Sequence, residues 1–410
     1  MKLLRGEEGR SLPFALVVVA VGALLVGPFL AHVSTSLLGS RAMQGGMNKR
    51  YACDAGVEFG IWKLVNDSTF RSQVDSTPGT PVPLGPITVN QFITAITATA
   101  LSTSGWSTLT DAPANVGAGG ALAYTGGDHI YALRGNNQTN LWQYSISGNS
   151  WAGRRATSAA VRAGGALAYD GDDYIYALHG NSTTTFRRYQ ISNNTWAGRR
   201  ATPNAVGAGG ALIYTGGDYI YAFRGGNTDD FWQYRISNNR WNWDGDPADP
   251  GVTIGPGGAL VYTGGDYIYA LQGNGTRTFL RYSISGNSWA TMASTPTGGN
   301  VGAGGALVYT GGDYIYALGG NTSRNFWRYS ISDNSWTSLP NAPDTIGDGG
   351  ALAYDGTYIY AFRGDNTNLF WRYSVGLPTY DIVAATDGVT TSGRVVISGT
   401  DVTIQSWEIE

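Results

Sequence analysis

The stretch GGALAYTGGDHIYALRG, residues 119–135, recurs five more times with small changes before residue 365. The second glycine of each copy gives the spacing of the repeats, which is 45, 45, 48, 47 and 45 residues; these glycines are Gly120, Gly165, Gly210, Gly258, Gly305 and Gly350. A repeat of this length is typical of one four-stranded blade of a β-propeller. Six copies therefore predict six blades.

Each repeat contains four segments with the composition of strands. The first is rich in small residues, which suits the crowded centre of a propeller, and the third is rich in aromatic residues, which suit the wider space between blades. Glycines of the TGGD type follow the first segment, and asparagines such as Asn149 and Asn194 follow the third. We expect antiparallel blades with the first strand innermost and with these asparagines closing Asx turns.

A tryptophan opens the fourth segment of every unit: Trp106, Trp151, Trp196, Trp241, Trp289 and Trp336. With the tyrosine of the third segment and the glycine that ends the second, this pattern resembles the kelch repeat. The resemblance implies a kelch-type propeller over residues 105–375. Kelch repeats carry a glycine pair here, whereas this chain varies the first position of the pair, which holds Arg134, His179, Arg224, Gln272, Gly319 and Arg363.

The first and last units are incomplete in a complementary way. Trp106 precedes the first GGAL segment, whereas the sixth unit ends near residue 375 without a tryptophan. We expect residues 105–110 to complete the sixth blade, because an unpaired edge would expose backbone donors and acceptors. The chain then enters and leaves on one face of the propeller. The loops that join second to third strands lie on the other face, which we call the distal face.

The N-terminal region predicts a membrane anchor. Residues 12–31 carry no charge, and twenty helical residues span about 30 Å, enough for a bilayer core. Lys2 and Arg5 precede this segment, which favours a cytoplasmic N-terminus and a propeller outside the cell. A secretory signal is the alternative, but no small-x-small cleavage site follows the apolar run closely.

The helix is expected to continue to about residue 67, because Val57, Ile61 and Leu64 recur at helical spacing. The leader ending EEG, the segment YACDAGVEFGIWKL (51–64) and the C-terminal SWEIE (406–410) resemble PilX-type minor pilins. The resemblance implies leader cleavage after Gly9 and other pilin-like subunits as partners. Pilins carry a glutamate five residues after the cleavage glycine. Phe14 stands there, which favours the tip of a filament.

Alternating apolar and polar residues before and after the propeller predict strands of one small sheet. Residues 68–104 are expected to hold a loop, over 68–86, and the first strand, and residues 376–410 the remaining strands. The predicted fold is mainly β, with a six-bladed kelch-like propeller inserted in a small pilin-like α+β domain that has a long N-terminal transmembrane helix.

Composition and motifs limit the functions. The net charge of −3 and the lack of a basic cluster argue against nucleic-acid binding. No nucleophile elbow, HExxH or phosphate-binding motif is present, so neither an enzyme nor a cofactor is expected. Two acidic segments could hold calcium, or their aspartates could simply reflect the preference of this residue for turns. The first contains Asp170, Asp172 and Asp173, and the second contains Asp244, Asp246 and Asp249. Cys53 lies on the predicted helix, where we expect it to pack.

The distal face carries the candidate ligand-binding residues: Arg134, His179, Arg224, Gln272 and Arg363. Their donors, beside loops rich in Asn and Thr, suit carboxylates or sugar hydroxyls, which favours adhesion to surface carbohydrate or an acidic polymer. The alternative is that the arginines fill the space of the missing glycine. The propeller could also be a structural or assembly module that contacts other pilins, or a glycan-active enzyme. For an enzyme, the repeats supply only Asp348 near the innermost strand.

Overall fold

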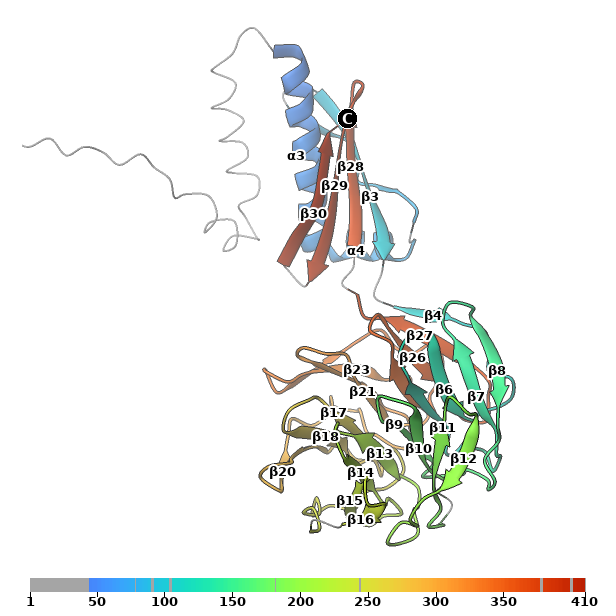
Figure 1. The fold of residues 1–410 in the computed structure, drawn as a ribbon. Helices are drawn as coiled ribbons and strands as arrows, with labels where there is room; N and C mark the ends of the chain where they lie inside the picture. The colour runs from blue at the N-terminus through green and yellow to red at the C-terminus, as the bar shows by residue number, and fades with distance from the viewer. Residues whose placement is uncertain are drawn as a thin grey trace, which may run out of the picture. The chain divides into compact units, whose positions relative to one another are not determined.

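A computed structural model describes residues 44–77, 79–89, 92–102, 105–180, 182–242, 245–376, 379–398 and 401–409. The chain forms two compact units, of which one is Gly105–Val375 and the other combines the segments before and after it (Figure 1). The predicted membrane segment 12–31 and the predicted cleavage after Gly9 lie outside the described residues. Within the ranges given above, neither helix is long and apolar enough to cross a membrane.

The unit Gly105–Val375 contains six four-stranded antiparallel sheets around a common axis (Figure 1). Blade 1 is β5 (Ala121–Tyr124), β6 (His129–Leu133), β7 (Leu141–Ser145) and β8 (Ser150–Arg154). Blade 2 is β9 (Ala166–Tyr169), β10 (Tyr174–Leu178), β11 (Phe186–Gln190) and β12 (Thr195–Gly198). Blade 3 is β13 (Ala211–Tyr214), β14 (Tyr219–Phe223), β15 (Phe231–Arg235) and β16 (Arg240–Trp241).

The other three blades repeat the pattern. Blade 4 is β17 (Ala259–Tyr262), β18 (Tyr267–Leu271), β19 (Phe279–Ser283) and β20 (Ser288–Thr291). Blade 5 is β21 (Ala306–Tyr309), β22 (Tyr314–Leu318), β23 (Phe326–Ser330) and β24 (Ser335–Ser338). Blade 6 is β25 (Ala351–Tyr354), β26 (Tyr358–Phe362), β27 (Phe370–Ser374) and β4 (Trp106–Thr108). The predicted mainly β propeller with four-stranded blades is confirmed.

The first strand of each blade contacts the first strands of its neighbours around the axis. Glycine is required just before this strand. Gly119 has a φ of +89°, and a Cβ there would lie 2.0 Å from the carbonyl oxygen of Arg162 in the next blade. The repeated GG pair therefore lets the blades approach one another closely.

Blade 6 is built from both ends of the propeller segment. Strand β4 pairs antiparallel with β27, and Trp106 lies opposite Tyr373. The Ser374 amide donates to the Gly105 carbonyl at 2.9 Å. The two ends of the propeller are therefore adjacent to each other.

Aromatic side chains fill the space between blades. Tyr144 and Trp151 of blade 1 pack against Phe370 of blade 6, with ring centroids 4.9 and 5.0 Å apart. Equivalent rings recur at the other junctions, for example Tyr234 and Trp241 against Phe186. Because each buried ring removes a large apolar area from water, these clusters form the core that joins neighbouring blades.

The asparagines after the third strands do not close Asx turns, contrary to our prediction. Asn149 has a φ of 43°, and its Oδ1 accepts from the Tyr144 hydroxyl at 2.8 Å and from the Thr110 amide at 2.9 Å. Thr110 follows the fourth strand of the preceding blade, and its carbonyl accepts from Trp151 Nε1 at 2.9 Å. Four further asparagines repeat this bridge between blades: Asn194, Asn239, Asn287 and Asn334.

The second unit places helix α3 (Gln44–Asn66) against an antiparallel sheet. The sheet order is β1 (Val82–Pro83), β3 (Phe92–Ser102), β28 (Thr379–Thr386), β29 (Val389–Ser398) and β30 (Asp401–Ile409), and β2 (Ile87–Val89) also pairs with β3. Val57, Ile61, Leu64 and Cys53 are buried in this interface. Burial raises the pKa of the Cys53 thiol, in agreement with a packing role.

Part of the segment 68–86, which we predicted to be a loop, is helical. Helix α4 (Ser68–Asp75) begins after Asp67, whose Oδ1 accepts from the Phe70 amide at 3.0 Å. Its last residue, Asp75, accepts from the Tyr380 hydroxyl of β28 at 2.7 Å. An N-cap, the contacts of Asp75 and Arg71 with Tyr380, and the burial of Val74 therefore stabilise a helix too short to show a clear apolar period.

The propeller is inserted between two paired strands of this second unit. Strand β3 ends at Ser102, which lies opposite Thr379, the first residue of β28. The inserted segment therefore leaves and re-enters the sheet at adjacent positions, so the host sheet can pair as if the insertion were a loop.

Candidate functional site

The predicted ligand-binding residues occupy equivalent positions after the second strands of five blades. In three of them the side chain donates to a carbonyl of the preceding interblade loop, nineteen residues earlier. Arg134 Nε bonds Asn115 at 2.9 Å, Arg224 Nε bonds Ala205 at 3.1 Å, and Gln272 Nε2 bonds Thr253 at 3.1 Å. These side chains therefore hold two loops of the propeller together.

The same side chains also bond the loop between the second and third strands. Arg224 Nη1 forms an ion pair with Asp230 at 2.6 Å, and Arg134 Nη1 donates to Asn140 Oδ1 at 3.3 Å. Gln272 Oε1 accepts from the Thr276 hydroxyl at 3.1 Å. Much of the hydrogen-bonding capacity that we assigned to a ligand is thus used within the protein.

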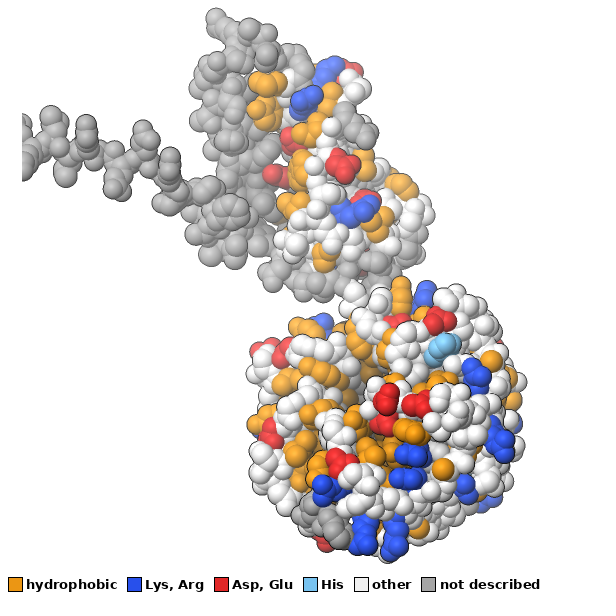
Figure 2. Space-filling view, viewed as in Figure 1, with side chains coloured by type: hydrophobic (Ala, Val, Ile, Leu, Met, Phe, Trp, Pro, Cys, Tyr) orange, Lys and Arg blue, Asp and Glu red, His pale blue; other side chains and the backbone are white. Residues whose placement is uncertain are grey.

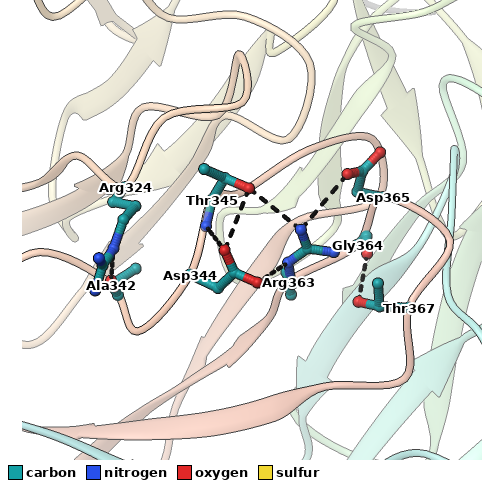
Figure 3. Close-up of polar contacts among 8 residues, drawn as sticks. All are labelled: Arg324, Ala342, Asp344, Thr345, Arg363, Gly364, Asp365 and Thr367. Atoms are coloured by element: carbon teal, nitrogen blue, oxygen red, sulfur yellow. Dashed lines mark hydrogen bonds and ion pairs between the residues drawn. The ribbon is translucent and has the colours of Figure 1, made fainter.

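Arg363 lies among three polar side chains of blade 6 (Figure 3). It forms ion pairs with Asp344 at 3.0 Å and Asp365 at 3.7 Å, and its Nη2 donates to the Thr345 hydroxyl at 3.2 Å. The Arg363 side chain is only 13% exposed, whereas the two carboxylates are about half exposed. An anionic ligand would have to compete with both carboxylates for this guanidinium.

His179 is 1% exposed, and its Nε2 lies 3.5 Å from the Thr157 hydroxyl. Burial, with a smaller contribution from the Arg187 charge, lowers the pKa of His179 to about 4. The imidazole is therefore neutral near pH 7 and lies inside blade 2. This burial leaves His179 poorly placed to contact a ligand on the distal face.

In blades 4 and 5, an arginine of the loop between the second and third strands bonds the interblade loop that follows the blade. Arg277 Nε donates to the Thr295 carbonyl at 2.6 Å, and Arg324 Nε donates to the Ala342 carbonyl at 2.7 Å (Figure 3). At Gly319, a Cβ would lie 2.8 Å from the Trp327 ring, so this blade has no room for a side chain there.

A cavity of about 70 Å³ lies on the propeller axis. Each blade lines it with the GG pair and the residue before that pair, and Asp348 is the charged residue among those lining it. The volume suits a few water molecules.

The acidic turns are engaged in backbone contacts. Asp170 Oδ1 accepts from the Asp172 and Tyr174 amides, both at 3.1 Å, and Asp249 Oδ1 accepts from the Phe231 amide at 2.9 Å. Asp244 lies outside the described residues. Across the described ranges, no group of three or more His, Cys, Asp and Glu side chains is placed to hold a metal ion. Calcium binding stays a prediction.

No family model matches this chain, and no curated protein matches it. The chain is similar to the solved structure of YjhT, with 14% identity and a TM-score of 0.51 over 73% of this chain and 100% of that one. It also matches the WD40 repeats of RRP9, with 11% identity and a TM-score of 0.46 over 68% of this chain and 99% of that one. At this identity, the YjhT match supports the propeller fold and carries no function.

Proposed function

We propose that this chain is a pilin-like, membrane-anchored subunit that displays its propeller outside the cell as a binding module. The insertion carries the proposal: the propeller replaces the connection between two paired strands, Ser102 opposite Thr379, of a small helix-on-sheet unit. That unit requires no part of the propeller to complete its sheet. The arrangement suits a stem that carries a separate binding domain.

The order of elements in the host unit supports the pilin-like part of the proposal. A helix is followed by an antiparallel sheet that packs on it, and the N-terminal and C-terminal sequences resemble PilX-type minor pilins. Other pilin-like subunits are the proposed partners in assembly. The absence of a glutamate at Phe14 favours a place at the filament tip.

Binding is favoured over catalysis by the way the charged groups are used. Asp128, Asp218 and Asp230 accept hydrogen bonds that hold loops together, and His179 is buried and neutral. The proposed ligand is a surface carbohydrate or an acidic polymer, recognised through arginine and amide donors.

The proposal is tested by labelling intact cells with an antibody against the propeller and by deleting residues 105–375. Because the insertion ends are adjacent in the sheet, a short Gly-Ser linker between Ser102 and Thr379 should leave the host unit folded. We expect labelling at pilus tips or on the cell surface, and loss of adhesion with retained pili after the deletion. Freely secreted protein, or unchanged adhesion after the deletion, would contradict the proposal.

A further inference from the structure

A cleft of about 860 Å³ opens between the outer parts of blades 2 and 3. Its lining includes Arg199, Arg200, Thr202, Arg240, Trp241 and Asn242, and we call it the rim cleft. It departs from the repeat because β16 has only two residues, Arg240–Trp241, whereas the fourth strands of the other blades have three to five. The repeat spacing is also longest here, at 48 residues.

Three arginines line the rim cleft. Arg199 Nε donates to the Tyr234 hydroxyl at 3.2 Å, and this bond holds the Nε end of the guanidinium in place. Arg200 is exposed, and within the described chain its side chain forms no hydrogen bond or ion pair. Among the described residues, no acidic side chain lines the cleft. In Figure 2, Lys and Arg side chains gather on the lower edge of the propeller, where Figure 1 labels β15 and β16.

Trp241 gives the rim cleft a fixed aromatic wall. Its Nε1 donates to the Arg200 carbonyl at 3.0 Å, and its ring packs 4.9 Å from Phe186 and 5.0 Å from Tyr234. These contacts hold the indole in place without a ligand. A preorganised aromatic surface binds at a lower entropic cost than a mobile one.

We propose that the rim cleft binds a carboxylated polysaccharide of the uronate type. Guanidinium groups bind carboxylates through paired hydrogen bonds, and an indole offers an apolar face to a sugar ring. The cleft volume lies within the range of small-molecule sites, about 300–1,000 Å³. The chain has a net charge of −3, which disfavours the extended phosphate contacts of a nucleic acid.

This inference refines the ligand of the proposed function and assigns it to residues other than the distal arginines. It rests on the proposed function only in taking the propeller to be outside the cell. If the cleft does not bind the polysaccharide, only the ligand assignment fails, and cell labelling still tests the surface location. If labelling shows that the propeller lies inside the cell, the binding measurement on the isolated protein is unaffected.

Arg155 provides a matched control for Arg200. It precedes blade 2 as Arg200 precedes blade 3: its amide donates to Asn194 Oδ1 at 2.8 Å, and its carbonyl accepts from Trp196 Nε1 at 2.7 Å. Arg155 is also exposed, but it does not line the cleft. Replacing either side chain removes one positive charge and leaves these backbone bonds in place.

The test is calorimetric titration of the full-length protein in detergent with oligogalacturonate and with its methyl-esterified form. We expect binding to the acid form only, about tenfold weaker in Arg200→Ala and unchanged in Arg155→Ala. Arg200→Glu should weaken binding further. Equal weakening by Arg155→Ala and Arg200→Ala, equal affinity for the two sugars, or no binding to the acid form would overturn the assignment.

Discussion

The Trp106 indole donates to the carbonyl of Pro340 at 3.1 Å and joins blade 6 to blade 5. At the other five junctions, the residue that accepts from the tryptophan also donates its amide to the asparagine of the following blade, as Thr110 donates to Asn149. Proline has no amide hydrogen, and blade 6 has no hairpin asparagine because its chain opens there into the host unit. The junction therefore leaves no unpaired amide at this position.

Replacing Trp106 by Phe should weaken the closure of the propeller. The change removes the hydrogen bond to Pro340 and should lower the free energy of unfolding by about 1–2 kcal/mol, measured by chemical denaturation. Hydrogen exchange in β4 and β27 should accelerate first. Trp336→Phe is the matched control, because Asn334 still bridges the same blades there and should limit the loss. Equal losses in both variants would contradict this explanation.

Acid should destabilise the propeller through its repeated aspartates. Hydrogen bonds, first from the Ser145 hydroxyl and then from the Ser147 amide, lower the pKa of Asp128, and equivalent bonds lower the pKa values of Asp173, Asp266 and Asp313. Because the folded pKa values lie below the unfolded value of 3.8, this stabilisation is complete above about pH 5 and is lost as the pH falls through the folded values.

The melting temperature should accordingly fall between pH 5 and pH 3, and the Asp128→Asn variant should show a smaller fall. Asp381→Asn, in the host sheet, serves as the comparison because Asp381 pairs with Arg394 outside the propeller. A propeller melting temperature that is constant over this range would show that these hydrogen bonds contribute no pH dependence.

Gly60→Ala should destabilise the host unit. A Cβ at Gly60 would lie 2.5 Å from Ile382 Cγ2, so helix α3 would have to move away from β28. We expect a loss of about 1–3 kcal/mol from overpacking, larger than the gain in helix propensity of about 1 kcal/mol. Gly153→Ala, where the Cβ would meet no atom within 4 Å, is the control. Gly60→Ala should cost less in an Ile382→Ala background, where the contacting Cγ2 is absent, and stabilisation by Gly60→Ala would contradict the packing argument.

Arg363 should contribute to stability through Asp344. Its side chain is 13% exposed and its Nε lies 3.0 Å from that carboxylate, so Arg363→Ala should lower the free energy of unfolding by about 1 kcal/mol. A double-mutant cycle of Arg363→Ala and Asp344→Ala isolates the pair. Additive losses would show that the two residues are not coupled.

Much of the propeller could be predicted from sequence because each repeat carries its own strand pattern, turn glycines and aromatic residues. Gly119 and Trp106 were informative, since one marks the crowded axis and the other the strand that β27 pairs with. The positions of Arg134 and Arg224 were also visible in the alignment of repeats. The backbone carbonyls that accept from these two arginines could not be predicted, because a carbonyl acceptor carries no side-chain signature.

By itself, the sequence determined the number of blades and the strands within each, because these follow from local periodicity. Only the tertiary structure decided what happens between segments. Asn149 bonds the preceding blade, Asp75 anchors α4 through Tyr380, and the short β16 opens a cleft beside Arg200. These features depend on which surfaces meet when the repeats close around an axis, and that contact is not encoded in any one repeat.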